Sequence, residues 1–173
     1  MRRRAAAGSL LAVATAGPLL AACAQEADGS AGSTDLDPAT AVVEYRYNDS
    51  SVPPEYHRSY TITVREGEAR MVVDSYGDGL HDVTEPVDDA MWADLLDEVA
   101  DVRVRQPGRS SECAGGTSRE IQVTDAEHPI EDPALHGHAE VCGGTGADDA
   151  RSIDAAIEPV LELFDTDVIL ATE

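Results

Sequence analysis

The chain between residues 60 and 74 reads YTITVREGEARMVVD, and this stretch decides the fold class. Its first half alternates large apolar residues with threonine, which is the period of two that a strand with one buried face requires. Glu66-Gly67 then supplies a turn, and a second strand-like run follows at 69–74. We therefore expect an antiparallel hairpin, with its first strand at 56–64, as the start of a sheet.

Two other segments have the spacing of amphipathic helices. The first follows a cap at Asp88 or Asp89, and its apolar stripe consists of Met91, Trp92, Leu95, Leu96 and Val99. The single tryptophan lies on that stripe, so we expect it in the core. The second follows a cap at Asp148 or Asp149, and its stripe consists of Ile153, Ala156, Ile157, Val160, Leu161 and Phe164. Pro159 falls within this stripe and predicts a kink or a restart.

Further short strands are expected at 41–47, 80–85, 102–105, 119–123 and 138–141. Strands, a helix, strands and a second helix, joined by short connections, predict an α+β fold. We expect a single domain at 41–165, an antiparallel sheet of about five to six strands with two helices on one face and one disulfide. Small and polar residues at 23–40 predict a flexible tether before it, and 166–173 is expected to be a C-terminal tail.

Residues 1–22 have the features of an export signal, because three arginines precede an apolar run too short and too interrupted for a membrane span. The run ends in Leu20-Ala21-Ala22-Cys23, which resembles the lipobox of bacterial lipoproteins. The resemblance implies that Cys23 becomes the mature N-terminus and carries a diacylglycerol. The protein would then be lipid-anchored in the cell envelope, on the extracytoplasmic side of a membrane. The alternatives are a plain secretory signal cleaved near Ala22 and, with weaker motif support, twin-arginine export.

The remaining two cysteines form an even pair. If lipid occupies Cys23, then Cys113 and Cys142 are left, and thiols outside the cytoplasm are expected to oxidise. A bridge that closes a loop of about thirty residues would stabilise the fold by roughly 3 to 4 kcal/mol in the chain-entropy model. The competing interpretation is a metal site or a nucleophilic thiol at these cysteines.

Charge restricts the partners. The chain has 34 acidic and 12 basic residues, for a net charge of −22, and contains no lysine. Removal of 1–22 takes away three arginines and no acid, so the mature charge is −25. Such a surface repels nucleic acid and anionic lipid headgroups, and the membrane link must then come from the lipid. The acidic excess is interpreted as a solvated face, with attraction of divalent cations or of a basic protein partner as alternatives.

Two segments, Cys113 to Thr117 and Cys142 to Gly146, share a cysteine followed closely by Gly-Gly-Thr. Glycines beside a disulfide permit tight turns, and the sharper alternative is a pair of backbone nests for an anion. With Tyr56 to Ile62 and Val73 to Asp78, these motifs make the chain similar to uncharacterised exported bacterial lipoproteins over about 41–164. This resemblance implies no activity, cofactor or site.

Two weak metal-site candidates are present. Asp74, Asp78 and Glu85 match most of a calcium-loop pattern, but Tyr76 replaces one ligand and the flanks predict strands, so a polar turn is the alternative. His136 and His138 are two residues apart and would project from one face of a strand, as a transition-metal pair needs. The spacing identifies no third ligand, and its candidates are His57, His81 and Glu140.

The sequence contains no nucleophile elbow, zinc-protease helix motif or phosphate loop. We therefore predict no catalytic residues and no cofactor. The leading hypothesis is a non-catalytic binding or envelope-interaction module with a protein partner of unknown identity. A divalent-cation binding protein is the first alternative, and a hydrolase is the second.

Overall fold

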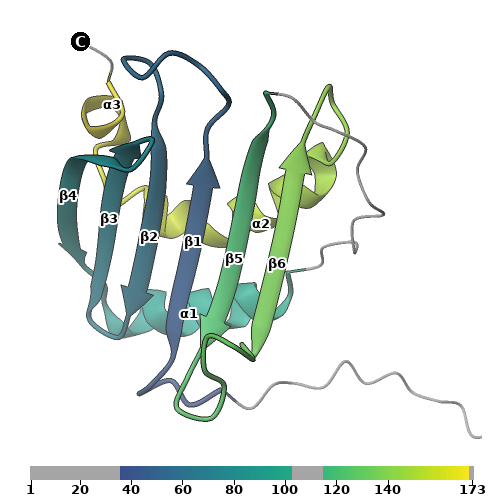
Figure 1. The fold of residues 1–173 in the computed structure, drawn as a ribbon. Helices are drawn as coiled ribbons and strands as arrows, with labels where there is room; N and C mark the ends of the chain where they lie inside the picture. Colours follow the sequence, from purple (N-terminus) through teal and green to yellow (C-terminus); the bar gives the residue numbers. More distant parts are fainter. Residues whose placement is uncertain (1–35, 103–114, 172–173) are drawn as a thin grey trace, which may run out of the picture. The chain divides into compact units, whose positions relative to one another are not determined.

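The computed structural model describes residues 36–102 and 115–171 of the chain. Figure 1 shows the arrangement of the secondary structure within them. In chain order the elements are β1 (Val42–Asn48), β2 (Ser59–Arg65), β3 (Glu68–Ser75), β4 (Asp78–Pro86), α1 (Asp89–Ala100), β5 (Thr117–Thr124), β6 (Leu135–Val141), α2 (Ala147–Leu161) and α3 (Thr166–Ile169).

The strands form one antiparallel sheet in the order β4-β3-β2-β1-β5-β6. The first four strands run outward from β1 to one edge, and β5 then pairs with the free side of β1. The helices α1 and α2 lie on the same face of this sheet (Figure 1). The predicted α+β fold, an antiparallel sheet of about five to six strands with two helices, is therefore confirmed, and the sheet has six strands.

The register explains why the helices cover only one face. Val43 of β1 lies opposite Val64 of β2 and Val123 of β5. Tyr45 lies between Ile62 and Ile121 in the same way. These residues are at most 1% exposed, whereas the threonines and charged residues that alternate with them are not buried. Burial of each large apolar side chain contributes about 1.5–3 kcal/mol, so the helix side of the sheet holds the core.

The first helix begins as the sequence predicts. The Asp88 carboxylate accepts a hydrogen bond from the Met91 N–H at 2.8 Å, which is the predicted cap. Trp92 is 4% exposed, and its Nε1 donates to the Pro38 carbonyl at 3.2 Å. The tryptophan therefore belongs to the core, as predicted, and also holds the segment that leads into β1.

The second helix differs from the prediction at its start. Its N-cap is Gly146, with no side-chain cap, and Asp148 and Asp149 lie in the first helical turn. The predicted cap at these aspartates is therefore wrong, although acids in a first turn still favour a helix because its N-terminus is the positive end of the dipole. The helix runs through Pro159 to Leu161 without the restart that was one of the two alternatives.

The strand predicted at 102–105 lies almost entirely outside the described residues, and so do Cys23 and Cys113. Lipid attachment and the disulfide therefore stay predictions. Within the segment expected as a tail, Thr166–Ile169 forms α3, and Ile169 is buried against the core.

The turn between β6 and α2 explains the Gly-Gly-Thr pattern at Cys142. Cys142 and Thr145 exchange backbone hydrogen bonds of 3.1 and 2.9 Å around Gly143 and Gly144, both of which have positive φ. This two-residue turn is the type that favours glycine. Gly146 also has a positive φ of 80°, and a Cβ built there would lie 2.0 Å from the Glu140 carbonyl oxygen.

This geometry separates two glycine substitutions. Gly144→Ala meets no atom within 4 Å, so only its positive φ should count, at about 1–2 kcal/mol. Gly146→Ala should lower the free energy of unfolding by clearly more, because its Cβ forces β6 and α2 apart. Urea unfolding of both variants under non-reducing conditions measures the difference. Equal losses would show that the close approach at Gly146 is wrong.

Candidate functional site

A groove with a volume of about 750 Å³ lies between α1 and α2. Its walls come from both helices and from the α1 cap: Asp88, Ala90, Met91, Asp94, Leu95, Asp97, Glu98, Ala155, Ala156, Pro159 and Val160. Several of these residues lie on the helix faces that the sequence predicts, whereas the sequence does not predict that the two helices lie side by side. We call this feature the interhelix groove.

The floor of the interhelix groove is apolar. Leu95, Ala156 and Val160 are buried residues of the core cluster, and Met91 is half-buried beside them. Small side chains at Ala155 and Ala156 leave the space open on the α2 side. These three buried residues are at most 4% exposed, so α1 and α2 already cover most of this part of the core.

All polar side chains at the rim of the groove are hydrogen-bond acceptors. The lining includes the four carboxylates of Asp88, Asp94, Asp97 and Glu98, and none of its other side chains has a donor. No ion pair within the described residues involves any of the four. Asp88 already accepts the capping hydrogen bond of α1, which leaves the other three carboxylates facing solvent.

Backbone electrostatics add to this negative character. Asp97 and Glu98 lie in the last turn of α1, where no basic residue is present. The C-terminal end of a helix is the negative end of its dipole, so carboxylates there are unfavourable for the helix. Pro159 has no N–H, so the Ala155 carbonyl lacks its usual intrahelical donor. Both effects would make the binding of a positively charged or hydrogen-donating group at the groove more favourable.

A second cavity, of about 540 Å³, lies between α2 and the sheet. Its lining includes three tyrosines of the sheet, Tyr45, Tyr47 and Tyr60. The Tyr47 ring stacks on Tyr60 of β2 at 5.1 Å, and the Arg119 guanidinium lies 4.8 Å from the Tyr47 centroid. Because β2 and β5 flank β1 on opposite sides, these neighbours cover both faces of the ring. Both faces of the Tyr47 ring are thus already in contact with other side chains.

The same cavity contains a hydrogen-bond network around the Asp154 carboxylate. The Tyr45 hydroxyl donates to Asp154 Oδ1 at 2.8 Å, and Arg119 Nε lies 3.2 Å from Asp154 Oδ2. Burial, together with the charges of Tyr60 and Asp154, raises the pKa of Tyr45 far above its ordinary value. The Tyr45 hydroxyl therefore stays protonated and donates to Asp154, and this contact joins α2 to the sheet.

One histidine and one serine meet in a way that a hydrolase hypothesis must consider. Ser59 Oγ lies 3.3 Å from His57 Nε2. Both residues are buried, and the Tyr76 ring stacks on His57 at 3.9 Å. The Asp49 carboxylate accepts hydrogen bonds from the backbone N–H groups of Ser50 and Arg58 rather than from the histidine. The described residues thus provide no open Ser-His-Asp arrangement here.

The calcium-loop candidates do not converge. Asp78 lies opposite Ser75 in the turn between β3 and β4, and the Asp74 carboxylate accepts a hydrogen bond from the Gly77 N–H at 2.8 Å. Glu85 lies opposite Ala69, near the other end of β4. Glu85 is seven positions along β4 from Asp78, a distance of about 23 Å at 3.3 Å per residue. The polar β-turn interpretation fits this arrangement.

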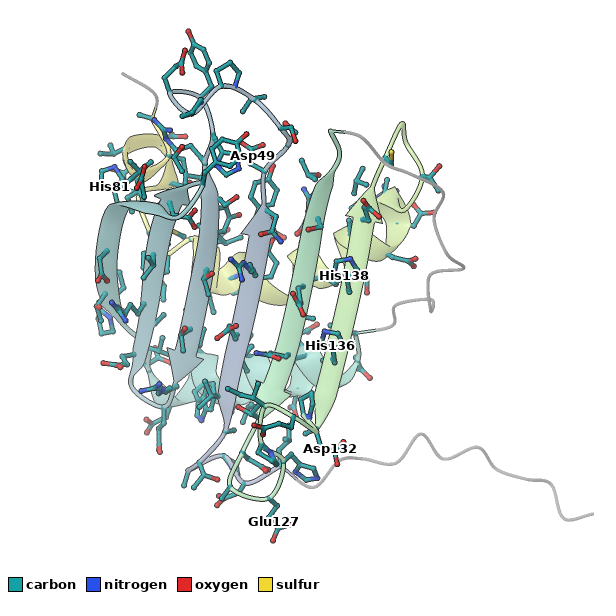
Figure 2. All side chains as sticks on the ribbon, viewed as in Figure 1. Asp49, His81, Glu127, Asp132, His136 and His138 are labelled. Carbon is teal, nitrogen blue, oxygen red and sulfur yellow. The ribbon has the colours of Figure 1, made fainter. Side chains whose placement is uncertain are left out.

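The two histidines of the other metal candidate do share a face. His136 and His138 project from β6 on the side of the sheet away from the helices, whereas His81 lies at the opposite sheet edge (Figure 2). His136 Nε2 lies 2.8 Å from Glu120 Oε1, a carboxylate that the sequence analysis did not consider. Within the described ranges, no group of three or more His, Cys, Asp or Glu residues is placed to hold a metal ion.

A buried carboxylate joins the start of the folded part to the β5–β6 loop. The Asp125 side chain accepts hydrogen bonds from the N–H groups of Asp37, Glu127 and His128 and lies 2.9 Å from His128 Nδ1. Burial acts to raise its pKa, but these hydrogen bonds outweigh burial and lower the pKa to about 2. Asp125 therefore stabilises the fold in its charged form.

The Asp125→Asn substitution should lower the free energy of unfolding at pH 7, because a neutral amide cannot accept the same charge-assisted hydrogen bonds. A carboxylate whose pKa is about 3.9 unfolded and about 2 folded stabilises the fold above pH 3.9 and loses this effect as pH falls through 2. The difference between wild type and variant should therefore shrink from about pH 4 to about pH 2 in urea-unfolding measurements.

The matched control is Asp132→Asn, which removes one charge from an exposed position in the same loop (Figure 2). It corrects for the general relief of repulsion in an acidic protein. A wild-type advantage over Asp125→Asn that stays constant down to pH 2 would contradict the low pKa.

No family model, curated protein or solved structure matches this chain. No helix among the described residues is long and apolar enough to cross a membrane. The function must therefore be argued from the groove itself. The sequence contained a signal for it, because the polar positions of α1 are acidic without a single base and Pro159 interrupts the next helix pattern.

Proposed function

We propose that this protein is a lipid-anchored binding module on the extracytoplasmic side of the cell envelope, and that it binds a protein partner through the interhelix groove. The observation that carries the proposal is the interhelix groove itself, in which apolar residues lie beside carboxylates that have no ion-pair partner within the described residues. A solvated acidic face has no need of such a groove. The divalent-cation and hydrolase alternatives lack an assembled site in the same residues.

The anchoring part of the proposal rests on Cys23. Its place after a basic start and an apolar run supports lipid attachment. A mature charge of −25 would otherwise keep the domain away from anionic headgroups, so a covalent lipid is the means by which this protein stays at a membrane.

The proposed bridge between Cys113 and Cys142 is consistent with the register. Cys142 directly follows Val141, which lies opposite Thr117. Cys113 precedes Thr117 by four residues, and four residues of chain span at most about 14 Å. A bridged pair needs its Cα atoms about 4.4–6.8 Å apart, which this length permits.

Intact mass spectrometry of the protein extracted from its native envelope tests both cysteine assignments. The protein should begin at Cys23 with a diacylglycerol attached. Iodoacetamide should add nothing before reduction and should label two thiols after it. A chain without lipid whose Cys23 reacts before reduction would indicate a plain secretory signal. Early labelling of the other two cysteines would show that no bridge forms.

Cross-linking in the native envelope tests the binding function. The protein with Cys23 intact should be captured together with a defined partner, and the Asp94→Arg/Glu98→Arg variant should lose that partner because the reversed charges repel it. The matched control, Glu127→Arg/Asp132→Arg, changes the net charge equally in the β5–β6 loop (Figure 2). A partner retained by the groove variant, or lost equally from both variants, would contradict binding through the groove.

A further inference from the structure

We propose that one end of the sheet is a second interaction surface, which binds an apolar patch, surrounded by basic side chains, on another protein. The surface consists of exposed apolar side chains from three segments, and we call it the apolar end: Tyr56, Tyr76, Leu80 and Val168. These residues are between 40% and 64% exposed, in contrast to the buried floor of the interhelix groove. The apolar end is separate from that groove and therefore goes beyond the proposed function.

The apolar end is a cluster and not a scatter of single residues. Its members come from the loop 49–58, from the β3–β4 turn with the start of β4, and from α3. These segments meet at one end of the sheet, where Figure 2 labels Asp49 and His81, whereas Glu127 and Asp132 lie at the other end. Four of the five large hydrophobic residues that are exposed in the described part of the chain therefore gather here. Single exposed apolar residues are ordinary, but a cluster of them indicates an interaction site.

Hydrogen bonds hold the three segments to one another. The Tyr76 hydroxyl, in the β3–β4 turn, donates to the Val52 carbonyl of the loop 49–58 at 2.6 Å. Arg58, at the end of the same loop, donates to the Ala171 carbonyl just after α3 at 3.3 Å. The apolar side chains are therefore presented by segments that contact each other in the folded domain.

The backbone at Tyr76 is a second, independent sign that this surface is built for contact. Tyr76 has a φ of 53°, the one positive φ of a non-glycine residue in the described ranges, and Gly77 follows with 92°. A two-residue turn with both φ angles positive favours asparagine or glycine at its first position, so tyrosine is locally unfavourable there. The turn holds the Tyr76 ring against the buried His57 at 3.9 Å and still leaves Tyr76 56% exposed. Residues held in such strained conformations concentrate at binding and catalytic sites.

Charge decides between three kinds of partner. Glu55, Asp78 and Asp167 are exposed, lie within two positions of the apolar residues in the chain, and have no ion pair within the described residues. These acids repel anionic headgroups, and they repel the same acids on a second copy of this chain. A different protein with basic side chains around an apolar centre would complement both the acids and the apolar residues.

The size and the place of the apolar end agree with a protein partner. Four such side chains expose together on the order of 400 Å², within the range of the largest apolar patches on soluble monomers. Each partner in a standard interface buries about 800 Å², so the polar surroundings would supply the other half. The strand β1 starts at the opposite end of the sheet (Figure 1), so the predicted tether at 23–40 joins the domain away from the apolar end.

The test places a photo-reactive phenylalanine analogue at Val168 of the full-length chain in its native envelope. The matched control carries the same analogue at Ile130, which is 70% exposed in the β5–β6 loop at the opposite end. The analogue at Val168 should cross-link to one other protein, and the analogue at Ile130 should not. Tyr56→Ser/Leu80→Ser should reduce the yield at Val168 about tenfold, as expected for the loss of two apolar contacts. The urea-unfolding midpoint should stay unchanged, because both replaced side chains are exposed.

The captured protein, once purified, is then titrated against the mature chain in solution. Asp78→Asn/Asp167→Asn should weaken binding about two- to tenfold, as expected for two exposed ion pairs. Glu127→Gln/Asp132→Asn removes the same number of charges at the other end and should leave the affinity unchanged. Equal weakening by the two variants would show general charge attraction and overturn the proposal.

The cross-linked products separate the other partners. Products with lipid would show a membrane-binding surface, and products with a second copy of the chain would show self-association, so either would overturn the proposal. Equal products from Val168 and Ile130, or no protein product from Val168, would overturn it too. The groove variant Asp94→Arg/Glu98→Arg should keep the Val168 product, and its loss there would show that the apolar end is no separate surface.

Discussion

The packing of β1 between β2 and β5 is the constraint on which the rest of the structure depends. Each inward residue of β1 has an apolar neighbour on both sides, as Val43 has in Val64 and Val123. A shift of one residue in either pairing would move these side chains to the polar face. The hydrophobic material therefore lies on one side of the sheet, and both long helices must cover that side. The groove between them is a consequence of this one-sided core.

The two layers of the fold differ in how they balance charge. On the exposed face of the sheet, two acids have basic neighbours: Asp82 lies 2.5 Å from Arg70, and Glu120 lies 2.8 Å from His136. In α2, Asp154 contacts both Arg119 and Tyr45, which joins the helix to the sheet. In α1 the acids have no base on the same helix. The acidic side chains of α1 on one side of the groove are thus without a basic partner on their own helix.

Sequence reasoning predicted the individual helices and strands better than the contacts between them. The hairpin at 60–74 and the stripe that includes Trp92 were predictable because period-two and helical patterns reflect a single buried face. The start of α2 was not, because Gly146 replaces a side-chain cap through close backbone approach to Glu140, which only the folded turn creates. The interhelix groove and the Tyr45–Asp154 contact join residues more than fifty positions apart in the chain, and local patterns do not specify such pairs.

What separates the groove from an ordinary solvated face is the coincidence of two locally unfavourable choices. Carboxylates in the last turn oppose the dipole of α1, and a proline within α2 removes a backbone hydrogen bond. Solubility alone requires neither, because acids elsewhere on the surface would serve equally well. Sequences are usually consistent from local preference to global fold, and departures from that consistency concentrate at functional sites. Here both departures line one groove, and this coincidence is the reason that we place the proposed binding function there.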